Sequence, residues 1–142
     1  MMSEHHPDVL CLSDAERPGF LPDLFSRDFM LSEATVYAYA GRYCPEYQGG
    51  YWQFYRLPEG GGYMAPDTEI LTFRNADNGF EQSVSGEVAG IILTALVLNH
   101  RSWHHSHNDQ EALCHHFCRR YEQLMAFVDS HPQSATVWRA LD

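Results

Sequence analysis

The chain has no lysine. Its nine basic residues are all arginines, against nineteen aspartates and glutamates, and the net charge is −10 with histidine neutral. This absence excludes lysine-dependent nuclease and phosphoryl-transfer centres. Because DNA binding depends on lysine and arginine replacing counterions, direct nucleic-acid binding is not expected either. The acidity either favours basic partners, such as the DNA-binding grooves of other proteins, or only keeps the chain soluble, and both interpretations stay open.

Motifs typical of several enzyme classes and of membrane proteins are missing too. There is no G-x-S-x-G nucleophile elbow, and the four cysteines form no C-x-x-C pair. The longest apolar run, residues 88–98, is too short to span a bilayer and predicts a buried core helix. The first twenty residues are polar and contain Pro7 and Pro18. We therefore expect no signal peptide, reduced thiols and a cytoplasmic protein.

The length and composition suit one folded domain. With 142 residues, 44% of them hydrophobic, the chain is able to bury a real core. We predict a poorly structured segment over residues 1–19, frayed over 1–8, with a possible short edge strand at 9–12. The remainder, residues 20–142, is predicted to form a single domain without repeats or long linkers.

Helical patterns flank a central region of strands. The first helix is predicted to begin near Pro22, to show helical spacing from Ser26 and to end before Pro45. After the strands, Ser85 is a good N-cap for an apolar, central helix that reaches about Trp103.

Two further helices are predicted near the carboxyl end. Asn108, with Glu111 three residues later, predicts an N-cap. The helix that follows carries one apolar stripe, made of Leu113, Phe117, Tyr121, Leu124, Met125 and Val128. A short last helix ends at Leu141. The predicted fold is α+β, with a small antiparallel β-meander packed against several helices.

The stretch GGYWQFYRLPEGGGYMAP, residues 49–66, places four aromatic residues between two glycine clusters and a fifth, Tyr63, directly after the second. Its EGGG sequence lacks the lysine and the strand-to-helix context of a phosphate-binding loop. We therefore predict a hairpin turn between strands at 51–57 and 62–66, continued by strands at 69–74 and 80–84. The aromatic residues are expected to build one face of the sheet, with core packing favoured over a ligand surface.

The region from residue 100 to 118 concentrates histidine and cysteine. His100 and His104 are four residues apart, as are Cys114 and Cys118, so each pair can share a helix face and together they could bind zinc. The alternative, which we favour, is that the cysteines are small buried hydrophobic residues. Three other histidines are expected to face solvent: His105, His107 and His115. A hydrolytic Asp/His site assembled by folding also stays open.

Charge is segregated along the chain. Between residues 59 and 87, only Arg74 opposes a series of acidic residues near the predicted turns. Such carboxylates either bind a basic partner or form a solvated set of turns. A further carboxylate directly follows the last predicted helix, where negative charge is unfavourable with the helix dipole. The predicted partner-binding residues are Asp67, Glu69, Asp77, Glu81 and Asp142.

Three segments together resemble the ArdB/KlcA antirestriction family. They are FLPDLFSRDFMLSEATVYAYAGRYCPEYQGGYWQFYRLPEGGGYMAP, VSGEVAGIILTALVLNHRSW and HPQSATVWRALD. The resemblance covers roughly residues 20–142, and the aromatic and glycine-rich block is its most specific part. The surplus of histidine and cysteine between residues 104 and 118 is not typical of the family.

The resemblance implies a small bacterial protein encoded on plasmids, prophages or other mobile elements. Such proteins protect incoming DNA from type I restriction–modification systems. It implies an α+β fold, no known cofactor and no known enzymatic reaction. We predict an inhibitor, monomeric or weakly dimeric, that acts on the type I restriction–modification complex directly or indirectly. The alternative is a small-molecule or metal-dependent enzyme that uses the region 100–118.

Overall fold

The structure is a computed structural model that describes residues 9–142, so the predicted frayed segment 1–8 lies outside the described residues. In chain order the elements are β1 (Leu10–Cys11), the 3-10 turn η1 (Arg17–Gly19), α1 (Phe20–Phe25), the 3-10 turn η2 (Ser26–Asp28), α2 (Phe29–Tyr43), β2 (Trp52–Arg56), β3 (Gly62–Pro66), β4 (Leu71–Asn75), β5 (Phe80–Val84), α3 (Gly86–His107), α4 (Glu111–Asp129) and α5 (Ser134–Leu141).

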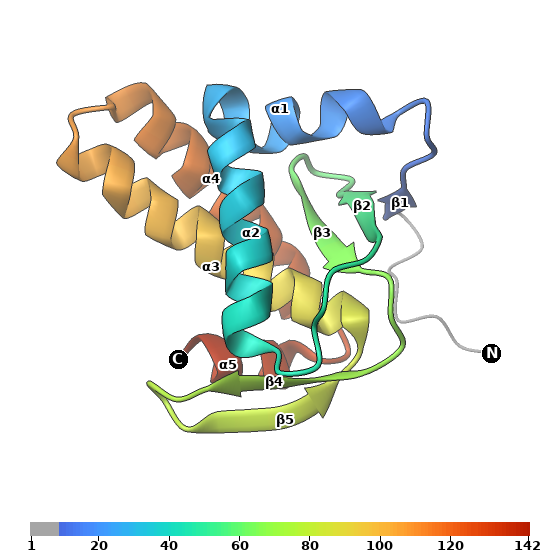
Figure 1. Ribbon diagram of the computed structural model, residues 1–142. Coiled ribbons are helices and arrows are strands. Elements are labelled where there is room, and N and C mark those ends of the chain that lie inside the picture. Colours follow the sequence, from blue (N-terminus) through green and yellow to red (C-terminus); the bar gives the residue numbers. More distant parts are fainter. Residues whose placement is uncertain (1–8) are drawn as a thin grey trace.

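Helix α3 is the centre of the α+β fold. It contacts α2, α4, α5, β3 and β4, and Figure 1 shows α2 crossing in front of it. Residues 86–98 of α3 are all buried, as the apolar run predicted. Within the part of the chain that the structure describes, no helix is long and apolar enough to cross a membrane.

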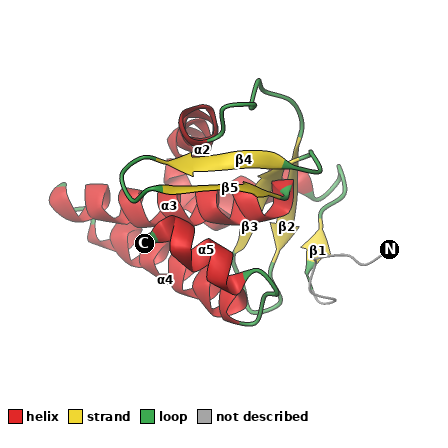
Figure 2. Ribbon diagram, turned by 90° about the horizontal axis from the view of Figure 1, so that it is seen from below, coloured by secondary structure: helices red, strands yellow, loops and turns green. Residues whose placement is uncertain are grey.

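The strands form two antiparallel sheets and not one meander, which corrects the predicted connectivity. One sheet has the order β1-β2-β3, with the predicted short strand as β1 at its edge, and the other is the β4-β5 hairpin. Pro66 ends β3 and has no N–H to donate to a further strand. The start of α3 then fills the space beside the β3–β4 loop, because Gly86 packs directly on the carbonyls of Pro66 and Thr68. Figure 2 shows the separate hairpin, which contacts α2 and α5.

The first predicted helix is broken in two. Ser26 adopts a φ of 55°, between α1 and η2, and the chain changes direction there. Helix α1 begins at Phe20, so Pro22 lies at its third position, where a missing N–H is still harmless. Helix α2 ends at Tyr43, as Pro45 predicted. The break matters because it directs Asp28 toward α3.

The N-cap of α3 was predicted correctly and that of α4 was not. Ser85 Oγ accepts a hydrogen bond from the Val88 N–H at 3.1 Å. Asn108, by contrast, closes α3: its Nδ2 donates to the His104 carbonyl at 2.8 Å, and α4 starts after Gln110 without a side-chain cap. The apolar stripe of α4 is buried as predicted except at Tyr121, which is half-buried.

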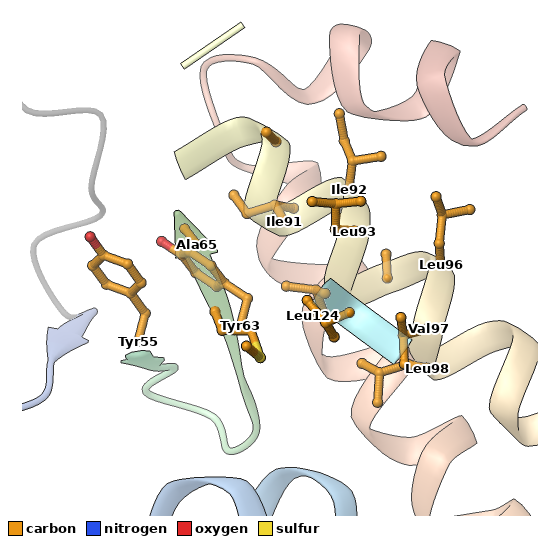
Figure 3. Packing of buried hydrophobic residues seen from close by; sticks show 14 of the residues in the cluster. Tyr55, Tyr63, Ala65, Ile91, Ile92, Leu93, Leu96, Val97, Leu98 and Leu124 are labelled. Carbon is orange, nitrogen blue, oxygen red and sulfur yellow. The ribbon is translucent and has the colours of Figure 1, made fainter. Parts of the chain in front are cut away.

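Glycine brings β3 into direct contact with α3. A Cβ at Gly90 would lie within the van der Waals radii of Ala65 and of the Met64 carbonyl. Figure 3 shows the surrounding packing, with Tyr63 and Ala65 of β3 on one side and Ile91 of α3 on the other. The absence of a side chain at residue 90 therefore lets the sheet lie on the helix backbone.

Candidate functional site

The predicted partner-binding carboxylates are all exposed, but they do not form one patch. Asp67 and Glu69 lie in the loop between β3 and β4, and Asp77 lies in the turn at the opposite end of β4. Glu81 lies on the exposed face of β5, and Asp142 follows α5. The fold therefore divides the five residues between the two ends and the outer face of the hairpin.

Asp77 and Asp142 lie at the same end of the hairpin. Asn78 Nδ2 donates to the Ala140 carbonyl at 3.0 Å, which holds the end of α5 against the β4–β5 turn. Figure 1 shows the chain terminus beside this turn. Asp77 is only 3.8 Å from Arg42 Nη2, so its charge is partly compensated by this exposed pair.

The loop carboxylates differ from the hairpin carboxylates in charge compensation. Glu81 forms two hydrogen bonds with Arg74, the shorter at 3.1 Å. Within residues 9–142, neither Asp67 nor Glu69 forms an ion pair. Asp142 forms none within these residues either, so the uncompensated negative charge of this set lies on the β3–β4 loop and on Asp142 after α5. Uncompensated negative charge is the property that attracts a basic partner.

Two exposed apolar side chains lie next to these loop carboxylates. Ile70 is 65% exposed and Tyr51 is 50% exposed. Both line a hollow of about 150 Å³ that Asp67 also lines, and the Asp67 N–H donates to the Tyr51 carbonyl at 2.9 Å. Exposed aromatic side chains are enriched at protein-binding surfaces, and the neighbouring acidic groups favour a basic partner.

Arg17 completes this surface. Its guanidinium carbon lies 4.6 Å from the centre of the Tyr51 ring and 4.0 Å from that of Phe54. Arg17 Nη1 is buried and has no hydrogen-bond partner, the one such side-chain atom in the described part of the chain. A buried donor without an acceptor calls for an explanation such as a ligand or a partner group. We call the set Arg17, Tyr51, Asp67, Glu69 and Ile70 the Tyr51–Ile70 surface.

The other aromatic residues of the glycine-rich block are core residues, as predicted. Trp52, Phe54, Tyr55 and Tyr63 are all buried. Only Tyr51 is exposed. The prediction of core packing is therefore correct for the other four aromatic residues, and only Tyr51 is available to a ligand or partner. Sequence reasoning missed Arg17 altogether, since it lies in the segment predicted to be poorly structured and no motif connects it to Tyr51.

The glycine turn of the block packs against α4 and has the predicted strand-to-strand context. Gly60 and Gly61 have φ values of 106° and 73°. A Cβ at either residue would come within 2.9 Å of the Gln123 amide, whose Nε2 donates to the Glu59 carbonyl at 3.2 Å. A groove of about 690 Å³ lies beside this contact, with Leu57 and Phe127 in its lining. Gly60 and Gly61 therefore serve close packing in a strand-to-strand turn, and this turn is not a phosphate-binding loop.

The prediction that His105 faces solvent is wrong, whereas His107 and His115 are exposed as predicted. The His105 side chain is only 2% exposed, and its Nε2 lies 3.2 Å from Asp28 Oδ2. The same carboxylate accepts two hydrogen bonds from Arg101, both at 3.0 Å. This cluster joins η2 to the last turns of α3, and no spacing along the chain could have predicted it.

A second buried polar cluster contains residue types that often serve in catalysis. The Tyr63 hydroxyl donates to Glu87 Oε2 at 2.8 Å. His131 Nδ1 accepts from the Gln133 N–H at 2.9 Å, so Nε2 carries the proton and faces Glu87 Oε1 at 3.3 Å. Burial, followed by the Glu87 charge, raises the pKa of Tyr63 far above its usual range. Because Tyr63 and His131 are closed off from solvent, the cluster fixes the junction of β3, α3 and the chain before α5.

The predicted histidine and cysteine pairs do not combine. His100 Nδ1 lies 2.7 Å from the Tyr39 hydroxyl of α2, and burial lowers the pKa of His100. Cys114 is half-buried and Cys118 is exposed on α4, so the favoured interpretation of both as small buried hydrophobic residues is wrong. Within residues 9–142 there is no group of three or more histidine, cysteine, aspartate or glutamate side chains that could hold a metal ion.

Comparisons with known proteins agree on one family. A family model described as "Antirestriction protein" matches residues 45–142. The putative antirestriction protein YubI of Escherichia coli (strain K12) is 43% identical over 136 residues, which cover 96% of this chain and 96% of that protein. The antirestriction protein KlcA of Escherichia coli is 38% identical over 134 residues, covering 92% of each.

A solved structure is similar over the whole length. It has a TM-score of 0.84, is 36% identical and covers 100% of both chains. It comes from work on KlcA and ArdB, which were found to have a novel fold and antirestriction activity against type I DNA restriction systems in vivo but not in vitro.

Proposed function

This chain belongs to the ArdB/KlcA antirestriction family, and from that membership we propose that it protects incoming mobile-element DNA from type I restriction–modification systems. The observation that carries the proposal is the full-length structural match to proteins with this activity in vivo. The exposed surfaces, and not the buried clusters, are then the parts of the molecule that act.

The proposed mechanism is inhibition by binding, without catalysis. The side chains suited to catalysis, Tyr63, Glu87 and His131, have almost no access to solvent, which supports a structural role for them. The related proteins act in vivo and not in vitro. This favours a target present in the cell, namely the type I complex in its working state or a factor that acts with it.

The Tyr51–Ile70 surface is the proposed contact with that target. It combines exposed apolar side chains with uncompensated acidic groups, which match a basic partner with an apolar centre. The Arg17 guanidinium packs on the Tyr51 ring of this surface, 4.6 Å from the ring centre. Asp77, Glu81 and Asp142 make up a second, weaker proposal, because Arg42 and Arg74 pair with the first two.

Replacing both Tyr51 and Ile70 with alanine is expected to reduce protection at least about tenfold. Truncation of an interface anchor costs more than about 1 kcal/mol, and two such losses exceed a factor of ten. The measurement is the plating efficiency of unmodified phage on bacteria with an active type I system. Trp103→Ala is the matched control, since Trp103 is an aromatic residue that is 60% exposed on the last turns of α3.

Charge reversal separates the two acidic groups. Asp67→Arg with Glu69→Arg is expected to reduce protection more than Asp77→Arg with Glu81→Arg. All variants should retain the circular dichroism spectrum and melting temperature of the wild type. Neither the wild type nor any variant should protect unmodified phage much against a type II system. Equal protection against type I and type II systems would contradict the proposal. An equal loss of protection in the control Trp103→Ala would contradict it too.

A further inference from the structure

Two cysteines outside the Tyr51–Ile70 surface lie side by side on α4. Cys114 and Cys118 are four residues apart in this helix, so their side chains project from the same face on successive turns. Cys118 is close enough to Cys114 to contribute to the raised pKa of the Cys114 thiol. Cys118 is exposed and Cys114 is half-buried, so solutes have access to the pair. Neither thiol is part of the main core cluster.

The surroundings of Cys114 are polar. It lines a hollow of about 380 Å³ at the corner between α3 and α4, together with Ser106, Glu111 and His115. Burial, followed by the neighbouring Cys118, raises the pKa of Cys114. The Cys114 thiol therefore keeps its proton in the free protein unless a ligand displaces it.

We propose that Cys114 and Cys118 form a two-coordinate binding site for the thiophilic monovalent cation Cu(I). Sulfur ligands select soft ions of this kind. The coordination number follows from the absence of a third suitable ligand: the described residues contain no group of three histidine, cysteine, aspartate or glutamate side chains able to share an ion. Zinc prefers four ligands in a structural site, so this pair is a poor zinc site.

Binding at this site is a ligand exchange without a redox step. Each thiol releases one proton to solvent, two copper–sulfur bonds form, and copper stays in the Cu(I) state. Two thiolates and one monovalent cation leave the site with a single negative charge. Ser106, which lines the same hollow as Cys114, is then the polar side chain placed to act as an outer-shell partner of the Cys114 sulfur.

The test is a Cu(I) titration of the reduced full-length chain, in competition with the chromogenic chelator bathocuproine disulfonate. The wild type is expected to withdraw one equivalent of Cu(I) from the chelator. Cys114→Ser and Cys118→Ser should each weaken binding more than about 100-fold, since loss of an outer-shell partner alone costs about 10–100-fold. Cys11→Ser is the matched control: Cys11 is an exposed cysteine with Gln53 as its hydrogen-bond partner, and its removal should leave the affinity unchanged.

Two results would overturn the inference. Cu(I) affinity within about threefold of the wild type in Cys118→Ser would show that the pair is not the site. The second result is that the wild type retains one equivalent of Zn(II) through dialysis and Cys118→Ser does not. This would indicate a zinc site with more than two ligands. Circular dichroism of each variant checks that α4 stays folded, which is expected because Cys118 is exposed.

Discussion

Replacing Asp28 with alanine is expected to lower the free energy of unfolding by about 3–5 kcal/mol, the range for breaking a buried ion pair from one side. Asp28 accepts hydrogen bonds from Arg101 Nε and Nη2, both at 3.0 Å, and from the Ser32 hydroxyl at 2.8 Å. The side chains of Arg101 and Asp28 are only 13% and 12% exposed. Without the carboxylate, a guanidinium would stay buried and lack its acceptor, and His105 Nε2 would lose its partner while Nδ1 keeps Gln110.

The matched control for Asp28 is Glu81→Ala. Glu81 also forms two hydrogen bonds with an arginine, but that pair is 56% and 53% exposed at Glu81 and Arg74. An exposed pair contributes about 0–1 kcal/mol, so the urea midpoint should hardly move. His104→Ala with His107→Ala should be equally mild, since both side chains are exposed. If Asp28→Ala and Glu81→Ala lower the free energy of unfolding by similar amounts, burial does not decide how strongly these ion pairs stabilise the fold.

Gly90→Ala and Gly41→Ala are expected to change stability in opposite directions, although both glycines lie inside helices. A Cβ at Gly90 would overlap Ala65 and the Met64 carbonyl of β3. Overpacking of this kind costs about 1–3 kcal/mol or more, because the sheet must move away from α3. At Gly41, on α2, no atom lies within 4 Å of the added Cβ. Alanine there should stabilise by about 0.4–1 kcal/mol through a less flexible unfolded chain.

Urea denaturation of both glycine variants measures this difference directly. The wild type should lie between them in unfolding midpoint, with similar dependence of free energy on urea concentration. A stabilised Gly90→Ala would contradict the close approach of β3 to α3. A destabilised Gly41→Ala would contradict the open space at the surface of α2.

Local patterns predicted most of the secondary structure. The segments 62–66 and 80–84 became β3 and β5 without any shift, because glycine turns and short apolar runs determine strand ends locally. Ser85 capped α3 as predicted, since a cap depends on residues within one turn. Asn108 does not cap α4 because its side chain donates to a carbonyl at the end of α3. The sequence does not distinguish an asparagine that ends one helix from an asparagine that starts the next.

The candidate site was predictable only in part. Asp67 and Glu69 were predicted from the local excess of acidic residues, and both lie on the proposed surface. Arg17 was missed because it contacts Tyr51, 34 positions later in the chain, and the rings it stacks on gather only in the folded molecule. The pairing of Glu81 with Arg74 also depends on the register of β4 and β5, which no composition argument supplies.

The sequence by itself determined the α+β class, the buried helix over residues 88–98, the hairpin turn at the glycine cluster and the resemblance to the ArdB/KlcA family. These features depend on neighbours within a few residues or on a string that can be compared directly. The tertiary structure alone decided that the strands form two sheets, that His105 is buried on Asp28, and that Arg17 packs on the rings of Tyr51 and Phe54. The physical reason is that burial and charge pairing depend on distances in space between residues far apart in the chain, which only the packing around α3 establishes.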